Sequence, residues 1–123
     1  MLKLLKNTLF NMVMKSYIDL EQSKILSKIL PIESADMQWI IDDLGEPFPF
    51  PIDDKVNENE EPCWSLTSLL CNIPSPVLSE NSGSWTVSSL DSKFPISSFG
   101  NGENPVDACY EMILLLNKHN YYD

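Results

Sequence analysis

The sequence predicts an α+β fold in which helices pack on a small antiparallel sheet made of a hairpin and one further strand. Helical patterns lie toward both ends of the chain, and the alternating patterns typical of strands lie between them. Two strand patterns follow each other closely, as in a hairpin, and no regular alternation of strand and helix points to a parallel sheet. At 123 residues the chain has the length of one domain. We expect a single domain over residues 19–123, preceded by a helical extension over residues 1–18.

The N-terminal extension carries apolar residues at helical spacing from Leu2 to Val13, which favours an amphipathic helix. The alternative is that Met14 is the true start and the first 13 residues are not part of the chain. Asn7 and Asn11 interrupt the apolar stretch and no small-residue cleavage site follows, so a secretory signal is not expected.

The next helix is expected over Asp19–Leu30, because Asp19 and Gln22 have the spacing of a capping box and Pro31 ends the pattern. After a turn, Met37–Ile41 reads as a short strand, since it is rich in β-prone apolar residues and is followed at once by turn residues.

The segment from Asp42 to Pro62 is predicted to be a long acidic, proline-rich loop. It holds eight of the 18 acidic residues of the chain and one lysine. Within it, proline at every second position of the PFPFP sequence (47–51) is expected to block both helix and ladder hydrogen bonding, leaving an extended or polyproline-like segment. A loop of this length inside a compact domain is often functional or disordered.

A short helix is expected from about Trp64 to Ile73, with either Cys63 or Ser65 near its first turn and Pro74 after it. Ser84–Leu90 and Lys93–Phe99 then both alternate apolar and polar residues, which predicts a β-hairpin joined through the LDSK sequence (90–93). Pro95 lacks a ladder donor and places the second of these strands at an edge or a bulge.

The last helix is the best-defined element. Asn104 has the position of an N-cap, Pro105 that of the first helical residue, and Lys118 lies in the last turn, where its charge suits the helix dipole. The apolar stripe consists of Val106, Cys109, Tyr110, Ile113 and Leu116. We expect this helix to be the chief stabilising element and to cover a hairpin bearing Trp85, Val87, Phe94 and Ile96.

Four blocks of the sequence occur together in one group of proteins: LEQSKIL (20–26), ADM (35–37), PCWSL (62–66) and NPVDACYEMILLLNK (104–118). On these blocks the chain resembles a group of small uncharacterised acidic proteins of gut Bacteroidales genomes, their phages and mobile elements. The resemblance implies a phage or mobile-element setting and an α+β fold. It implies no activity, substrate or catalytic residue, and it does not extend to the N-terminal extension or the acidic loop.

Composition limits the classes of partner. The formal net charge is −10, and all eight basic residues are lysine, so the chain lacks the arginine fork that suits phosphate and base recognition. Direct nucleic-acid binding is therefore not expected. No apolar stretch is long enough to cross a bilayer, so no membrane partner is expected. Three widely spaced cysteines do not form a disulfide framework, which favours the reducing cytoplasm.

The sequence offers little that is typical of an enzyme, and we expect no catalytic activity, metal or cofactor. Cys63 near a helix start, with His119 as the only histidine, is the sole candidate for a nucleophilic pair. Core packing is the simpler interpretation of Cys63, and also of Cys71 and Cys109, which fall on apolar helix faces. Zinc-ligand spacings, an EF-hand loop and phosphate-binding glycine motifs are absent from the sequence.

These considerations leave a non-catalytic protein-interaction module, encoded by a phage or mobile element, as the expected function. An extended segment of prolines and aromatic residues can dock on a partner, whereas the tryptophans are expected in the core. The alternative is an acidic inhibitor that mimics nucleic acid and occupies a basic groove of a host protein. The candidate partner contacts are Phe48, Phe50, Asp53, Asp54, Glu58, Glu60 and Glu61.

Overall fold

The computed structural model describes residues 15–52, 60–91 and 99–123. Residues 1–14 of the predicted helical extension (1–18) lie outside this range, and the described residues 15–18 are not helical, which corrects that part of the prediction. The fold is α+β, as the sequence predicts. The described helices are α2 (Leu20–Leu26), α3 (Leu66–Cys71) and α4 (Pro105–Lys118), with a short 3-10 helix at Ile32–Ser34. The described strands are β1 (Met37–Ile41), β2 (Pro47–Pro51), β3 (Pro62–Cys63), β4 (Pro76–Asn81), β5 (Ser84–Ser89) and β6 (Gly100–Gly102).

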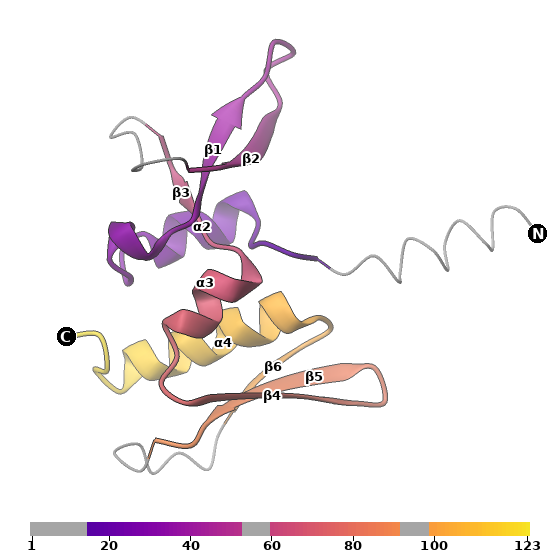
Figure 1. Cartoon of the computed structure of the whole chain (residues 1–123), viewed down its shortest axis with the longest axis vertical. Helices are drawn as coiled ribbons and strands as arrows, with labels where there is room; N and C mark the ends of the chain where they lie inside the picture. The colour runs from indigo at the N-terminus through magenta and orange to yellow at the C-terminus, as the bar shows by residue number, and fades with distance from the viewer. Residues whose placement is uncertain (1–14, 53–59, 92–98) are drawn as a thin grey trace, which may run out of the picture.

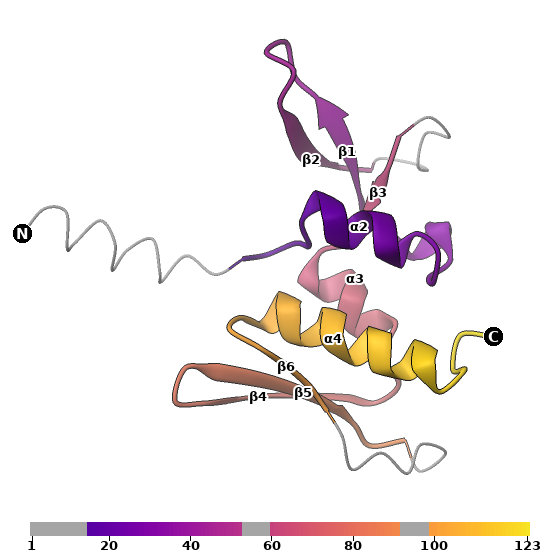
Figure 2. The ribbon, with the colours of Figure 1, turned by 180° about the vertical axis from the view of Figure 1, so that it is seen from behind.

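The strands form two antiparallel sheets rather than one. Each has three strands, in the orders β2-β1-β3 and β4-β5-β6. The helices lie between the two sheets in both views, and the β1–β2 hairpin projects at the far end of the molecule (Figures 1 and 2). One cluster of buried apolar side chains joins the layers, and it includes Ile18, Leu26, Trp64, Leu69 and Ile113.

The PFPFP segment is a strand, which corrects the prediction that its prolines block a ladder. β2 pairs with β1 in the register Trp39↔Pro49. The main-chain hydrogen bond from Asp42 N to Glu46 O (2.9 Å) makes these two residues a hydrogen-bonded pair. Hydrogen-bonded and non-hydrogen-bonded pairs then alternate along the ladder. The alternation turns the N–H groups of Phe48 and Phe50 toward β1 and the nitrogens of the three prolines toward the free edge. Proline is tolerated here because β2 is an edge strand whose prolines occupy only the outward positions.

The second hairpin is formed by β4 and β5, and β4 is a strand that the sequence did not predict. β5 matches the first predicted strand, and its partners are β4, through pairs such as Leu78↔Val87, and β6. The turn between β4 and β5 is Ser82-Gly83, both with positive φ (54° and 83°), which is the geometry of a two-residue hairpin turn. Of the expected partner strand at 93–99, all but Phe99 lies outside the described residues.

Helix α4 confirms the prediction made from its sequence. Asn104 caps it through a hydrogen bond from Asp107 N to Asn104 Oδ1 (2.8 Å), Pro105 is its first residue, and every residue of the predicted stripe is buried. The helix packs on β5 and β6, so it covers the sheet that carries Trp85 and Val87. Phe94 and Ile96 of the predicted contact lie outside the described residues.

The two shorter helices are also fixed by their caps. Asp19 and Gln22 form the predicted capping box at α2, although the helix ends at Leu26 and only turns continue to Leu30. At α3, Ser65 is the N-cap, and its main-chain N–H donates to the Asp36 carboxylate at 2.9 Å. Asp36 thereby ties the start of α3 to the segment that leads into β1.

A partly buried polar network joins the N-terminal segment to the start of α4. Asp107 Oδ1 accepts from Lys15 Nζ (2.9 Å) and Gln22 Nε2 (3.0 Å), and Asp107 Oδ2 accepts from Asn104 Nδ2 (2.8 Å). Burial opposes ionisation of this carboxyl, but the hydrogen bonds from Gln22, Lys15 and Asn104 outweigh it and hold its pKa below the ordinary value. The network therefore fastens residues 15–22 to α4.

Candidate functional site

The tip of the β1–β2 hairpin is a tight turn held by an aspartate. The Asp42 carboxylate accepts hydrogen bonds from Leu44 N (2.9 Å) and Glu46 N (2.8 Å). Gly45 has a φ of +82°, a conformation that glycine adopts without steric cost. A three-residue loop that ends in such a glycine is a common hairpin connection. The turn therefore fixes the backbone of Leu44 at the tip of the hairpin.

Large apolar side chains are exposed along this hairpin. Leu44 is 88% exposed and Ile41 is 70% exposed. Phe48 and Phe50, two of the predicted contact residues, are 37% and 48% exposed. Their ring centroids lie 6.5 Å apart in an edge-to-face arrangement, as expected for neighbours on one face of a strand. The hairpin thus presents apolar surface that makes no contribution to the buried core.

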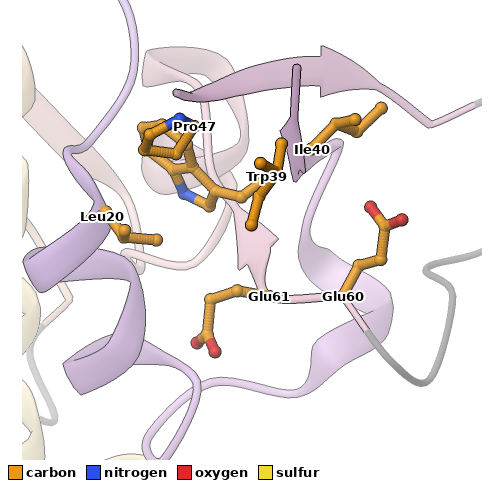
Figure 3. A pocket seen from close by; sticks show the side chains of 7 residues that line it. Leu20, Trp39, Ile40, Pro47, Glu60 and Glu61 are labelled. Carbon is orange, nitrogen blue, oxygen red and sulfur yellow. The ribbon is translucent and has the colours of Figure 1, made fainter. Parts of the chain in front are cut away.

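A cavity of about 400 Å³ lies at the base of this hairpin, beside α2 (Figure 3). Trp39 is its central residue. The indole Nε1 donates to Ser23 Oγ of α2 (2.8 Å), and the ring meets Tyr17 edge-to-face with centroids 6.2 Å apart. These two contacts fix the orientation of the indole. The lining consists of Leu20, Trp39, Ile40, Ile41, Pro47, Glu60 and Glu61.

Glu60 and Glu61, two more of the predicted contact residues, approach β1 from the side of β3. The bond from Trp39 N to Glu61 O (2.8 Å) places Glu61 opposite Trp39 in the ladder. Successive side chains of a strand point to opposite faces, and Figure 3 shows the two carboxyl groups directed away from each other. The structure therefore brings Phe48, Phe50, Glu60 and Glu61 to one end of the molecule. The other three predicted residues, Asp53, Asp54 and Glu58, lie outside the described range.

The three cysteines have different environments. Cys63 is buried, its Sγ donates to Ile18 O at 3.6 Å, and burial raises the pKa of its thiol to about 12. Burial likewise raises the pKa of Cys109 to about 12. Both thiols are therefore protonated at neutral pH, and Cys63 lies at the end of β3 rather than in α3. Cys71 is exposed, so the prediction that it packs in the core is wrong.

His119, the proposed partner of Cys63, is the C-cap residue of α4 and is exposed. Within residues 15–52, 60–91 and 99–123, no group of three or more histidine, cysteine, aspartate or glutamate side chains is arranged to hold a metal ion. None of the helices in the described part of the chain is both long and apolar enough to cross a membrane.

Comparison of the chain with protein-family models, with curated proteins and with solved structures finds no match.

Sequence reasoning missed four residues of this region: Leu20, Trp39, Ile41 and Leu44. Ile41 precedes the turn-forming Asp42–Gly45 sequence, and Leu44 lies within it. The available signal was Leu44, an apolar residue between turn residues. Trp39 was expected in the core. The indole packs against core residues but is only partly buried. Leu20 gave no signal, because the cavity arises only when α2 meets β1.

Proposed function

We propose that this chain is a non-catalytic protein-interaction module whose contact surface is the β1–β2 hairpin. The observation that supports the proposal is the exposure of Leu44 and Ile41 on a hairpin that projects from the helices (Figure 1). Exposed apolar patches on small proteins commonly mark interaction sites. Each such side chain contributes about 1.5–3 kcal/mol when it is fully buried.

The shape of the hairpin also indicates how a partner binds. The free edge of β2 offers no N–H donors, because Pro47, Pro49 and Pro51 occupy its outward positions. A partner therefore contacts the side chains of the hairpin and does not add a strand to its edge. The Asp42 hydrogen bonds order the tip before binding, so little conformational entropy is lost in the complex.

The setting that goes with this function is the cytoplasm of a host cell that carries the gene on a phage or mobile element. Support for the compartment comes from Cys63, Cys71 and Cys109, all of which are free thiols. The mobile-element origin is supported by the sequence resemblance alone, and the identity of the flanking genes tests it.

Affinity capture from a native-host lysate tests the interaction, with a matched pair of leucine variants. Leu44→Asn changes an exposed residue of the hairpin tip, and Leu90→Asn changes a leucine of similar exposure (75%) next to the other sheet. We expect wild type and Leu90→Asn to retain one protein at stoichiometric level and Leu44→Asn to lose it, with unchanged melting temperatures. Capture of the same protein by all three forms contradicts the proposal, as does turnover of a small molecule without any captured protein.

The nucleic-acid mimic is the second proposal for the same chain, and it is supported by the net charge of −10. It predicts that the captured protein binds nucleic acid, that added DNA or RNA displaces the chain, and that binding falls steeply with salt. The hairpin proposal predicts little competition by nucleic acid and loss of capture with Leu44→Asn.

A further inference from the structure

The cavity at the base of the hairpin contains an unsatisfied carboxylate oxygen. Among the described residues, Glu61 Oε1 is buried and has no hydrogen-bond partner, and the same is true of Glu60 Oε2, on the other glutamate of the lining. The ion pairs made by the described residues use Asp19, Glu21 and Asp107 instead. Burial of a carboxylate oxygen without a donor is unfavourable, so this position is suited to a cation that arrives from outside.

An indole lies on the same face as this carboxylate. Glu61 is opposite Trp39 in the ladder, and paired residues of an antiparallel ladder project to the same side of the sheet. Among aromatic side chains, the face of a tryptophan ring attracts ammonium and guanidinium groups most strongly. Apart from Glu60, the rest of the wall is apolar and includes Leu20, Pro47 and Ile41, which matches the methylene stem of a long cationic side chain.

We propose that this cavity binds a lysine or arginine side chain of the protein partner, with the cationic head between Glu61 and Trp39. The proposal rests on the proposed function and specifies the chemistry of its partner: a basic residue next to apolar ones. Ile41 lines the cavity and is also exposed on the hairpin, so the cavity and the apolar contact surface are continuous.

A protein side chain fits this cavity better than a metal ion. Calcium takes six to eight oxygen ligands and magnesium demands octahedral oxygen coordination. Here Glu60 and Glu61 diverge (Figure 3), so their two carboxylates do not converge on one ion. One carboxylate and an aromatic ring instead match an organic cation. The net charge of −10 adds long-range attraction for a basic partner.

The test follows the indole N–H signal of Trp39 by NMR in the full-length protein, with the signal assigned from a Trp39→Phe variant. The probes are blocked tripeptides, acetyl-Leu-Arg-Leu-amide, its Lys counterpart and its Gln counterpart, each titrated to about 10 mM. We expect the Arg or Lys peptide to shift this signal saturably and the Gln peptide to bind at least about tenfold more weakly.

Glu61→Gln keeps the shape of the side chain and should weaken the cationic peptide at least about tenfold, whereas Glu46→Gln, an exposed acid of the hairpin turn, should bind as wild type does. Melting temperatures verify that both variants fold. Equal binding of the Gln peptide, unchanged binding by Glu61→Gln, or no saturable shift with any peptide overturns the proposal.

Methylguanidinium alone is the final probe. If it binds as tightly as the Arg peptide, the ligand is a free small cation and the assignment to a partner side chain is wrong. Failure of the peptides is distinguishable from failure of the proposed function, because the Leu44→Asn capture experiment does not depend on the cavity.

Discussion

Gly100→Ala tests the close contact between α4 and the second sheet. An added Cβ at Gly100 would lie 2.3 Å from Ala108 O and 2.4 Å from Met112 N, both main-chain atoms of α4. Ordinary contacts between non-bonded carbon atoms are about 3.5–4.0 Å. The main chain of a helix does not yield as a flexible side chain does, so the strand and the helix must move apart.

The expected cost lies at or above the upper end of the range for overpacking, about 3 kcal/mol. Against a total of about 5–15 kcal/mol for a domain of this size, such a loss corresponds to a fall in Tm of about 10–15 °C. Gly100 does not have a positive φ, so the alanine itself is not strained. Without the contact, Gly→Ala would instead raise stability by about 0.4–1 kcal/mol, because it restricts the unfolded chain.

A thermal melt followed by circular dichroism therefore tests the contact through the sign of the change in Tm. Asn101→Ala is the matched control: it lies on the same strand, its side chain is exposed, and it should stay within about 0.5 kcal/mol of wild type. A Gly100→Ala variant that melts at or above the wild-type temperature refutes the described packing of β6 against α4.

Three further predictions concern thiols, pH and the sheet edge. Iodoacetamide at about pH 8 should label Cys71 in the folded protein, whereas Cys63 and Cys109, with pKa values of about 12, react only after unfolding; mass spectrometry of the digested protein locates the label. The folded pKa of Asp107 lies below its usual 3.8, so its contribution to stability is present above that value and is lost as the pH falls through the folded pKa. The gap in free energy of unfolding between wild type and Asp107→Asn should accordingly narrow from about pH 7 to about pH 3 in urea titrations. Pro49→Val restores an N–H donor at the free edge of β2 and should increase self-association relative to wild type in light scattering at rising concentration, and an unchanged apparent mass contradicts the assigned register.

Elements that begin with a cap were predictable from the sequence. Asn104-Pro105 fixes the start of α4, and the capping box at Asp19 fixes that of α2, because both act through hydrogen bonds within three residues. The end of α2 was less predictable. Its last predicted turn contains Leu30, which is buried and donates to Leu26 O (2.8 Å), although α2 ends at Leu26 and residues 27–29 form turns. The apolar spacing therefore predicted a helix longer than α2, because a residue beyond the helix end is buried as well.

Strand pairing was the weakest part of the prediction, since it depends on contacts between distant residues. PFPFP reads as a segment without a ladder until β1 is placed beside it in the register that turns all three prolines outward. β4 was not predicted, because Pro74 and Pro76 are typical of the end of a helix, although Ser82-Gly83 is a recognised hairpin signal. Gly100 and Gly102 read as loop residues, yet their two-residue spacing places both against α4.

For the candidate site, the sequence indicated the segment but not its geometry. Phe48 and Phe50 stood out because aromatic residues alternate with prolines, and both are exposed in the structure. Glu60 and Glu61 stood out only as part of a run of acids. That Glu61 shares a face of the sheet with Trp39 depends on the pairing of residue 61 with residue 39, which no local pattern contains.

The two ends of the molecule are stabilised in different ways, and this difference supports separate roles for them. The second sheet depends on tight packing against α4, where a methyl group added at Gly100 would clash with the main chain of the helix. The hairpin instead holds its shape through the turn at Asp42 and Gly45 and through proline rings whose φ is fixed. Because its form does not depend on burying Leu44 or Ile41, these side chains remain free to bury themselves in a partner. Substitutions at the tip should therefore affect binding and leave folding nearly unchanged, whereas substitutions beneath α4 should affect folding first.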